Sequence, residues 1–393
     1  MKGRVFSLVI LWLLVDLYFF SVVKLLTNNM TIYAVYWMVD ILLVCLVIYS
    51  LIIGKTKFVF SLMPVALLLF IPKLVASVLL LLEDITRLFR HFPSRNLFVS
   101  ELVVLIAFVF FLIVLFGITK GRHYYKVRRE LLYFENLPDT FDGFTITQLS
   151  DIHAGSFSDD KGVQKGLDLV NAQKSDMILF TGDLVNNKAS EMDQWISGFA
   201  GLTAPLGKYS VLGNHDYGDY IRWDSADAKR LNLIRLKNVH AEIGFHLLLN
   251  ESVTLNKDGH TIALVGVENW GKGGFHKYGD LKLATANVND GVFTILMSHD
   301  PSHWDAVTLK NNRHIDLTLS GHTHGAQFGF EVFGFKWSPI KYVYKQWAGM
   351  YKKRQPIFIR KQRIWFSRIE GSCWHMARDC RYNLKKESWI IKY

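Results

Sequence analysis

The stretch Gly213-Asn214-His215-Asp216 follows the short apolar run Tyr209 to Leu212. An amide, an imidazole and a carboxylate in consecutive positions are costly to bury without partners, so packing alone does not explain them. Four more polar clusters also begin where an apolar, strand-like run ends: Asp151-Ile152-His153, Gly182-Asp183, Ser298-His299-Asp300 and Gly321-His322-Thr323-His324. Carboxyl ends of parallel strands meet at one edge of a sheet. We therefore expect all five clusters to form one candidate active site.

The chain around these clusters alternates between two periodicities. An alternating strand at 144–149 precedes Asp151, a helical segment at 163–172 precedes the apolar run 177–180, and a second helix near 192–202 precedes the strand before Asn214. Between 239 and 267 the pattern changes to short strands separated by turns. Strand, helix and strand in succession predict an α/β layered domain.

The clusters offer seven donor side chains that suit borderline divalent ions: Asp151, His153, Asp183, Asn214, His299, His322 and His324. Mn, Fe and Zn accept carboxylate, imidazole and amide oxygen ligands. Seven donors exceed what one ion needs and predict two ions that share a carboxylate. In such a site, with ions ~3.5–4 Å apart, a bridging water becomes a nucleophile and both ions stabilise charge on a phosphoryl oxygen. The predicted chemistry is hydrolysis of a phosphate ester or anhydride.

Two residues of the opening stretch are predicted to be catalytic and not ligands. His215 stands beside a ligand candidate and can act as general acid to the leaving oxygen. Asp216 is expected to fix the tautomer of His215 and raise its pKa. Asp300 is expected to orient its loop. Surface or core roles are expected for the histidines that have no motif around them: His240, His246, His260, His303 and His314.

In this order and spacing, Asp-x-His, Gly-Asp, Gly-Asn-His-Asp, a lone His after a strand and Gly-His-Thr-His resemble the calcineurin-like metallophosphoesterases, over residues 144 to 335. The resemblance implies a four-layer α/β (α+β) domain, a β-sandwich flanked by helices. It implies one metal held by Asp151, His153, Asp183 and His324. It implies a second metal held by Asp183, Asn214, His299 and His322, with His215 in the position of the family's proton donor.

Four apolar spans precede this domain, at 6–26, 33–53, 60–82 and 97–118. Each is about 20 residues long, enough to cross a hydrocarbon core of ~30 Å. A cleaved signal peptide is the alternative for the first span, but its apolar run is too long and no small-residue cleavage site follows. The chain is therefore divided into a transmembrane region at 1–118, a basic juxtamembrane linker at 119–142, a phosphoesterase domain at 143–354 and an atypical tail at 355–393.

The loop charges predict the orientation of these spans. Nine Lys and Arg residues fall on the side of both chain ends in a four-span arrangement, against four on the other side. The positive-inside rule places the C-terminal domain in the cytoplasm of an inner or plasma membrane protein. Asp16, Asp40 and Lys73 lie within the spans, where an ionisable group is by default a functional candidate. Mutual pairing or contact with water is favoured over a transport or proton-relay role, because three scattered charges make no pathway.

The composition narrows the class of substrate. A formal net charge of +11 favours an anionic membrane surface or a phosphate-bearing substrate. A basic helix or a repeated aromatic and basic strand motif, the usual marks of a nucleic-acid binder, is missing from the sequence. Three cysteines argue against a disulfide scaffold and fit a reducing compartment. The motifs behind an N-terminal membrane region are similar to the membrane-associated bacterial branch of the family, which implies a lipid-linked pyrophosphate such as UDP-diacylglucosamine as substrate.

The tail departs from that branch, whose members usually end in a Gly-rich loop and a strand containing Pro-Glu-Ile. Here 355–393 is basic and Trp-rich. Read one base later, codons permitted for 359–369 can spell Tyr-Val-Asn-Arg-Gly-Phe-Gly-Phe-Leu-Gly, and those for 371–380 can spell Ala-Ala-Val-Gly-Ile-Trp-Pro-Glu-Ile. Both strings resemble the family's tail. We hypothesise that the tail from about Gln355 is frameshifted. Two other functions stay open: a phosphoesterase for a soluble substrate, and an inactive scaffold if the aberrant tail prevents folding.

Overall fold

The computed structural model describes residues 2–52, 56–119, 125, 127–157, 159–274, 276–323, 330–332, 335–346, 349–352, 357–360 and 380–386. These residues form two compact units, which are described separately. Parts of the predictions lie outside the described residues: His324, residues 120–124 of the expected linker and most of the tail.

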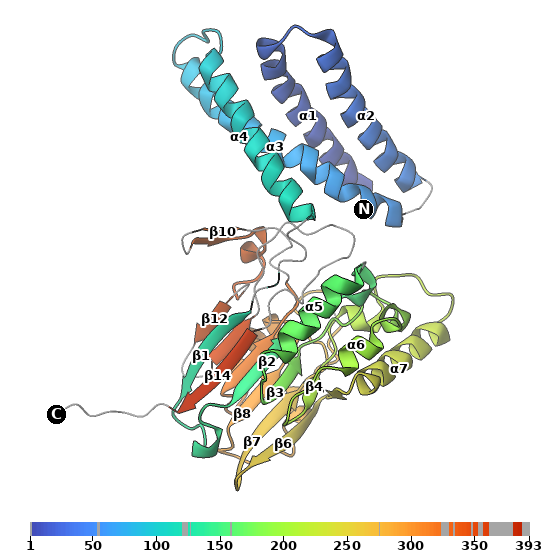
Figure 1. The fold of residues 1–393 in the computed structure, drawn as a ribbon, viewed down its shortest axis with the longest axis vertical. Helices are drawn as coiled ribbons and strands as arrows, with labels where there is room; N and C mark the ends of the chain where they lie inside the picture. Colours follow the sequence, from blue (N-terminus) through green and yellow to red (C-terminus); the bar gives the residue numbers. More distant parts are fainter. Residues whose placement is uncertain are drawn as a thin grey trace, which may run out of the picture. The chain divides into compact units, whose positions relative to one another are not determined.

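The first unit consists of long apolar helices (Figure 1). They are α1 (Lys2–Leu26), α2 (Met30–Ile52), α3 (Thr56–Leu88) and α4 (Leu97–Thr119). Within the described residues, each contains a segment long and apolar enough to cross a membrane: Val9–Leu26, Met30–Tyr49, Pro64–Leu88 and Leu97–Thr119. The four predicted spans are confirmed, and the third helix runs six residues beyond its predicted end at 82.

The interior of this bundle is formed by α1, α3 and α4. Phe19 and Val22 of α1 pack against Ala76 and Leu80 of α3, and Ala107 of α4 joins the same cluster. Small residues such as alanine let helix backbones approach closely, which is how helices associate where lipid removes the hydrophobic driving force. The buried Asp16 and Asp40 interrupt this apolar interior.

The second unit contains two six-stranded sheets and one two-stranded sheet. The first sheet has the order β1 (Arg128–Phe134), β14 (Cys380–Lys386), β2 (Thr145–Leu149), β3 (Met177–Phe180), β4 (Lys208–Ser210) and β5 (His246–Leu247). The second has the order β12 (Gly349–Lys352), β13 (Ile357–Arg360), β9 (Leu317–Ser320), β8 (Thr294–Met297), β7 (His260–Gly266) and β6 (Glu251–Lys257). β10 (Phe330–Val332) pairs with β11 (Phe335–Trp337). Strands β2 to β5 run parallel, as do β7 to β9.

The two large sheets pack face to face. One buried cluster joins Ile146 and Leu179 of the first sheet to Leu264, Ile295 and Leu317 of the second. Parallel strands that are covered on both faces need apolar residues at successive positions, and the sequence of these strands shows such continuous apolar runs. This confirms the predicted β-sandwich.

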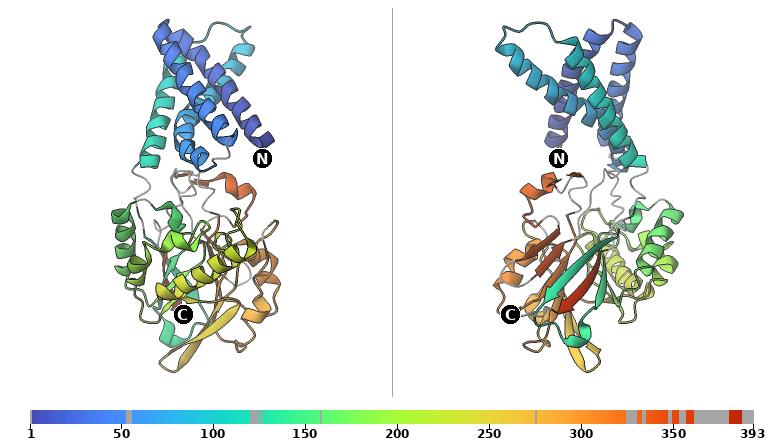
Figure 2. Two further views of the ribbon diagram at one scale, coloured as in Figure 1. Left: turned by 90° about the vertical axis from the view of Figure 1, so that its right-hand side faces the viewer. Right: turned by 60° about the vertical axis from the view of Figure 1, so that its left-hand side comes forward.

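Helices cover the outer faces of the sandwich. Figure 2 shows α5 (Asp160–Asn171) and α7 (Ala226–Glu242) on the same side of the first sheet, with the short α6 (Ile196–Ala200). Val163 and Leu167 of α5, Phe199 of α6 and Leu236 of α7 share one buried cluster with the sheet. The opposite outer face carries α8 (Leu281–Ala284), and α9 (Ser302–Ala306) follows β8. The four-layer arrangement of the prediction is therefore present.

The sequence interpretation missed α7. Residues 226–242 were not assigned to a helix, and the start of the strand region at 239 falls in the last turn of α7. Leu231 and Ile234 are exposed, so the apolar residues of this helix do not form one clean stripe. Beyond α7 the predicted short strands are present as β5, β6 and β7, and a turn at Asp258-Gly259 separates β6 from β7.

The structure extends the sandwich beyond the domain limits expected at 143 and 354. β1 lies inside the segment expected as a linker and pairs in parallel with β14, which belongs to the tail. β14 also pairs with β2, so a strand from 380–386 lies between two strands from the start of the domain. β13 of the tail pairs with β9. Short 3₁₀ helices complete the described elements: Asp139–Phe141, Ala154–Ser156, Ala189–Met192, His215–Tyr217, Thr308–Lys310 and Pro339–Tyr342.

Candidate metal centre

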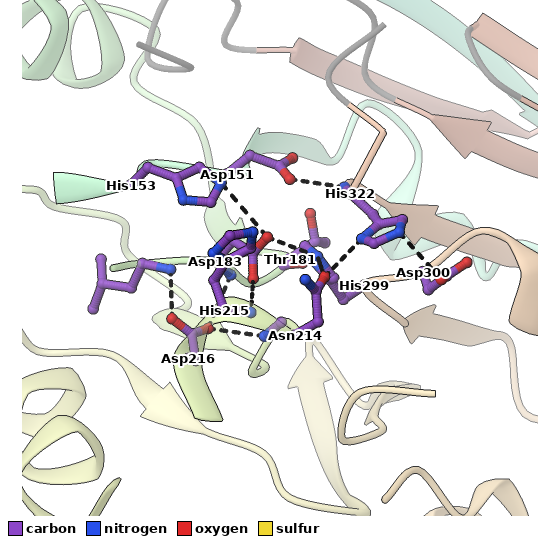
Figure 3. Close-up of polar contacts among 12 residues, drawn as sticks. Asp151, His153, Thr181, Asp183, Asn214, His215, Asp216, His299, Asp300 and His322 are labelled. Atoms are coloured by element: carbon purple, nitrogen blue, oxygen red, sulfur yellow. Dashed lines mark hydrogen bonds and ion pairs between the residues drawn. The ribbon is translucent and has the colours of Figure 1, made fainter. Parts of the chain in front are cut away.

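The polar clusters that follow β2, β3, β4, β8 and β9 meet at one edge of the sandwich, as the parallel-strand argument predicts (Figure 3). The loop after β9 contacts the loop after β2, where the backbone N–H of His322 donates to Asp151 Oδ1 over 2.8 Å. The loop after β4 contacts the loop after β3, where the backbone N–H of His215 donates to Asp183 Oδ1 over 2.8 Å. Asp151 therefore joins a loop of the first sheet to a loop of the second, and Asp183 joins two neighbouring loops of the first sheet.

Asp183 lies at the centre of the cluster. Its Oδ2 is 3.1 Å from Nε2 of His299 and 3.6 Å from Nε2 of His153. Two groups of side chains close enough to hold a metal ion both contain it, one with His153 and His215, the other with His299 and His322. A carboxylate common to two groups is the arrangement that two neighbouring ions require.

The orientation of His299 shows why a cation fits this centre. Its Nδ1 lies 2.7 Å from the carbonyl oxygen of Thr181, which can only accept, so Nδ1 carries the hydrogen. In the neutral ring Nε2 then has a lone pair, and it faces Asp183 Oδ2 and, at 3.1 Å, Asn214 Oδ1. Three electron-pair donors that converge without a hydrogen between them are satisfied by a metal ion or a proton. The chemistry and direction of these donors therefore fit a divalent ion.

The pKa values of His299 and Asp183 also favour positive charge at this centre. Burial lowers the pKa of His299, but the charge and hydrogen bond of Asp183, with the charge of Asp151 and the carbonyl of Thr181, together raise it to about 10. Burial raises the pKa of Asp183, whereas His299, His215 and His153 together hold it well below its ordinary value. The buried carboxylate therefore stays ionised and attracts a cation.

His322 completes a second set of donors. Its Nδ1 is 2.7 Å from Asn214 Oδ1, and its Nε2 is 2.9 Å from the hydroxyl of Tyr344 and 3.4 Å from Asp300 Oδ2. The hydroxyl of Tyr344 donates to Asp300 Oδ2 over 3.4 Å, so its oxygen is left to accept the hydrogen of Nε2, and the lone pair of Nδ1 is directed at the cluster. The sequence assigned Asp300 to its own loop and did not single out Tyr344, which lies 22 positions after His322.

Asn214 is held in the orientation of a ligand. Its Nδ2 donates to the hydroxyl of Tyr220 over 2.7 Å, and its Oδ1 faces both His299 and His322. An amide whose N–H₂ is occupied elsewhere presents only its oxygen to the centre. Tyr220 was also missed by the sequence interpretation, because it belongs to no motif.

His215 stands beside the donors with its ring held on three sides. Its Nδ1 donates to the backbone carbonyl of Asn186 over 2.9 Å. The ring stacks on Tyr220, with centroids 4.4 Å apart, and meets the edge of His153 at 4.7 Å. Because Nδ1 is occupied by a carbonyl, Nε2 is the ring atom left for chemistry.

Asp216 has partners that differ from the predicted one. Its two oxygens accept from the backbone N–H groups of Gly213, Asp183, Leu184 and Val185, over 2.8 to 3.2 Å. Burial, followed by the charge of Asp183, raises the pKa of Asp216 to about 7, while the amide donors act to lower it. The carbonyl of Asn186, and not Asp216, contacts the ring of His215. Asp216 joins the loop after β3 to the loop after β4.

The backbone at this edge is strained. Asp151, His153, Asp183 and His322 all have φ between +49° and +78°, a region that side-chain-bearing residues seldom adopt. Two glycines are needed for space. A Cβ on Gly213 would lie 2.2 Å from Asp183 Oδ1, and one on Gly321 would lie 1.9 Å from Ser150 Oγ. Strained ligand candidates and compulsory glycines are typical of functional sites.

The five histidines that were expected to have core or surface roles belong to neither group of possible metal ligands. His240 and His303 are buried beside Ser210 and Ser298, at 3.0 and 3.1 Å. His246 and His260 are exposed, and Nε2 of His314 is 3.0 Å from Asp316. These are the core and surface positions expected for them.

Both units are similar in sequence to known protein families. Residues 3–122 match the family described as "Probable Calcineurin-like phosphoesterase, transmembrane domain", and residues 144–326 match "Calcineurin-like phosphoesterase". The "Uncharacterized metallophosphoesterase YkuE" of Bacillus subtilis is 30% identical over 201 residues, 50% of this chain and 64% of that protein. The "Transmembrane protein with metallophosphoesterase domain" of Bos taurus is 29% identical over 232 residues, 57% of this chain and 48% of that protein.

A further relative is the "UDP-2,3-diacylglucosamine pyrophosphatase LpxG" of Chlamydia trachomatis, 30% identical over 233 residues. That match covers 49% of this chain and 68% of the chlamydial protein. The chain thus spans less than two thirds of the length of the Bacillus and bovine relatives. The two family matches confirm the resemblance predicted from the motifs and the integral membrane character predicted from the apolar spans. The chain belongs to the calcineurin-like phosphoesterase family, with a four-helix transmembrane domain before its metallophosphoesterase domain.

Proposed function

We propose that this protein is a membrane-anchored, two-metal phosphohydrolase that cleaves a phosphodiester or pyrophosphate bond. One observation carries the proposal. Asp183 Oδ2, Asn214 Oδ1 and His299 Nε2 converge within 3.1 Å contacts, although none of them has a hydrogen to donate in the neutral ring. A buried set of acceptors of this kind is stable around a proton on His299 or around a metal ion, and a bound ion takes the place of that proton.

The ligand sets proposed from the family pattern are Asp151, His153, Asp183 and His324 for one ion, and Asp183, Asn214, His299 and His322 for the other. The contacts of Asp183 with His153 and His299 and those of Asn214 with both later histidines support this division. Mn, Fe or Zn suits these oxygen and nitrogen donors. When bound, such a pair of ions supplies a nucleophile from water at neutral pH and stabilises negative charge on the phosphoryl group.

His215 is the proposed proton donor to the leaving oxygen. The carbonyl of Asn186 holds Nδ1, so Nε2 is the atom that gives the proton. Tyr220 and His153 restrict the ring to one orientation, which is the positioning that general acid catalysis needs. Asp216 contributes by holding the loop that carries His215, through its contacts with the amides at 183–185.

A lipid-linked substrate is the proposed class. The membrane helices precede the phosphoesterase domain in the chain, and the net charge of +11 favours an anionic partner. The chlamydial relative is named as a pyrophosphatase of UDP-2,3-diacylglucosamine, a nucleotide linked through pyrophosphate to an acylated sugar. The positive-inside rule further supports a cytoplasmic domain, which a cytoplasm-dependent fluorescent reporter fused to the C-terminus would test.

The test uses the purified full chain in detergent with Mn²⁺, a chromogenic phosphodiester and, separately, UDP-2,3-diacylglucosamine. Wild type is expected to hydrolyse both. His215→Ala is expected to lower kcat by about 10²–10⁴-fold, the usual contribution of a general acid. Asn214→Ala is expected to lower both activity and bound metal. Asp193→Asn, a change at an exposed carboxylate, is the matched control.

The outcomes separate the candidate functions. Turnover of the chromogenic diester without turnover of the lipid substrate favours a soluble or different substrate. No turnover by wild type, with metal bound, indicates a scaffold. Metal content also separates two roles for His215, because the group of His153, Asp183 and His215 is compact enough to hold an ion. Loss of one ion in His215→Ala would identify it as a ligand and contradict its role as proton donor.

A further inference from the structure

Three ionisable side chains meet inside the membrane helices. Lys73 Nζ of α3 lies 2.8 Å from Asp16 Oδ1 of α1 and also pairs with Asp40 Oδ2 of α2. The side chains of Asp16 and Asp40 are 0% and 2% exposed, and that of Lys73 is 12% exposed. The three residues are 24 to 57 positions apart in the sequence but form one cluster, which we name the Asp16–Asp40–Lys73 cluster.

The cluster lies well inside the membrane-spanning segments. Asp16 is seven residues from one end of the span Val9–Leu26 and ten from the other, about 10 and 15 Å at 1.5 Å per residue. Asp40 and Lys73 also fall within the spans of α2 and α3. At such depth water does not compensate a charge, and neighbouring groups must do so.

The charges of the cluster do not balance. Two carboxylates face one ammonium, which leaves one negative charge. The ring of Tyr36 lies 4.4 Å from Lys73 Nζ, but its hydroxyl donates to the backbone carbonyl of Asp16 and not to a carboxylate. The remaining helix of the bundle, α4, has a single charged residue, Glu101, and it is exposed. No described residue of these helices supplies the missing positive charge.

In a second ionic cluster of the same bundle the positive and negative charges are equal in number. Glu83 and Asp84 of α3 pair with Arg87 and Arg95, so two carboxylates meet two guanidinium groups. The carboxylate oxygens of Asp84 accept from Tyr18, Arg87 and Arg95. Of these two ionic clusters among the described helix residues, the Asp16–Asp40–Lys73 cluster is the one with an excess of negative charge.

The excess charge has two oxygens to which a cation can bind. Asp16 Oδ2 and Asp40 Oδ1 are buried and accept no hydrogen bond from any residue that the structure describes. The indole N–H of Trp12, one turn before Asp16, interacts with its carboxylate but makes no hydrogen bond with it. A neutral N–H would in any case leave the charge in place. Buried, ionised and unpartnered oxygens are unstable without a bound cation.

We propose that the Asp16–Asp40–Lys73 cluster is a binding site for one exchangeable monovalent cation, a proton or a sodium ion. The cation binds the oxygens that Lys73 leaves free, Asp16 Oδ2 and Asp40 Oδ1, and brings the cluster to neutrality. Lys73 pairs with both carboxylates and keeps them close together, so that one bound cation can neutralise the excess charge that they share. This site belongs to the membrane unit and does not depend on the proposed hydrolase activity.

The experiment uses the full chain in detergent micelles and has two arms that distinguish the cations. In sodium-free choline buffer, infrared spectroscopy detects a protonated carboxylic acid by its C=O stretching band. In the second arm, equilibrium binding of radioactive sodium to the same protein is measured. Wild type is expected to show the acid band or stoichiometric sodium binding, and sodium that displaces a proton is expected to remove the band.

Asp16→Asn and Asp40→Asn each make the cluster neutral and are expected to remove the sodium binding or the cluster's part of the acid band. That part is read from the difference between wild type and variant, because Asp216, whose pKa is raised to about 7, contributes to the total band. Glu101→Gln removes a carboxylate of α4 outside the cluster and is expected to leave both readouts unchanged. Wild-type protein with neither an acid band nor bound sodium would overturn the proposal, whether or not the variants fold. Readouts that persist at wild-type level in both asparagine variants would overturn it as well.

Discussion

The two units bury carboxylates in opposite ways. Asp216 in the phosphoesterase domain and Asp16 in the membrane bundle are both 0% exposed. Asp216 accepts four backbone N–H groups from the loops after β3 and β4. Asp16 has the ammonium of Lys73 on one oxygen, and its other oxygen accepts no hydrogen bond from the described residues. The difference follows from the elements that carry them.

Loops that leave a strand have backbone N–H groups with no partner in the sheet, and a carboxylate can collect them. Inside a long helix each backbone N–H already binds the carbonyl four residues earlier. A carboxylate on a membrane helix must therefore rely on side chains or on a bound cation. The phosphoesterase domain thus compensates Asp216 through backbone N–H groups, whereas the membrane unit compensates Asp16 through the ammonium of Lys73 and, in our proposal, a bound cation.

The largest effect is expected from a change at Asp183, the residue at the middle of the candidate metal centre. Asp183→Ala removes the carboxylate common to both proposed ligand sets, so hydrolysis should fall to background and both ions should be lost. Activity and metal content of the purified chain measure this. Asp193→Asn serves as control, since its side chain is 58% exposed. A variant that keeps two ions would contradict the shared ligand.

A smaller effect is expected from the residue that orients His322. Asp300→Ala removes the carboxylate that lies 3.4 Å from Nε2 and accepts from Tyr344, and losing such a partner of a ligand lowers metal affinity or activity by about 10–100-fold. Titration of the metal-free protein with Mn²⁺, read by activity, gives the change in affinity. Asp290→Asn is the matched control, because Asp290 is almost fully exposed. Unchanged affinity in Asp300→Ala would show that Tyr344 alone orients the ring.

Asp216→Asn tests whether backbone N–H groups stabilise the buried carboxylate of Asp216. An asparagine side chain has one acceptor oxygen where the carboxylate has two, so amide donors lose partners and unfolding should become easier by about 1.5–3 kcal/mol. Chemical denaturation followed by fluorescence measures the loss. The pH profile of the remaining activity should stay as in wild type. A shifted profile with unchanged stability would instead support the role first predicted from sequence, in which Asp216 acts on His215.

The smallest effect at neutral pH is expected from His240, a buried imidazole beside the hydroxyl of Ser210. Burial lowers the pKa of His240 from 6.5 to about 3, so the unfolded chain binds a proton that the folded chain does not. The stability tied to this residue is fully present above pH 6.5 and is lost as pH falls from 6.5 towards 3. Denaturation midpoints across this range should fall less steeply in His240→Gln. The exposed His260→Gln should follow wild type, and equal slopes for all three proteins would contradict the assignment.

The tail requires a separate check. The structure pairs β14, at 380–386, with β1 and β2, so this part of the chain belongs to the first sheet. The frameshift hypothesis stays a prediction, and it concerns the same strand. Sequencing the gene decides it, because bases that do not encode the family's tail in another frame would refute it. A shifted frame would change the side chains next to β2, the strand that leads to Asp151.

The sequence by itself determined the elements and the identity of the polar groups. Apolar stretches of about 20 residues define the membrane helices, since crossing a bilayer requires little beyond length and hydropathy. Polar motifs that follow apolar strands predicted which loops meet, because parallel strands end at one edge. Asp151, His153, Asp183, Asn214, His299 and His322 were singled out in this way. Local pattern failed at α7, whose apolar residues form no clean stripe.

Only the tertiary structure decided which atoms face one another. Nothing local connects His322 with Tyr344, Asn214 with Tyr220, or His215 with the carbonyl of Asn186. The same holds for Asp16, Asp40 and Lys73, which looked scattered along the chain and form one cluster. Such contacts depend on how loops and helices pack across tens of residues, and a pattern of residue types contains no information about side-chain direction at that range. Residue types thus predicted the chemistry, and packing decided its geometry.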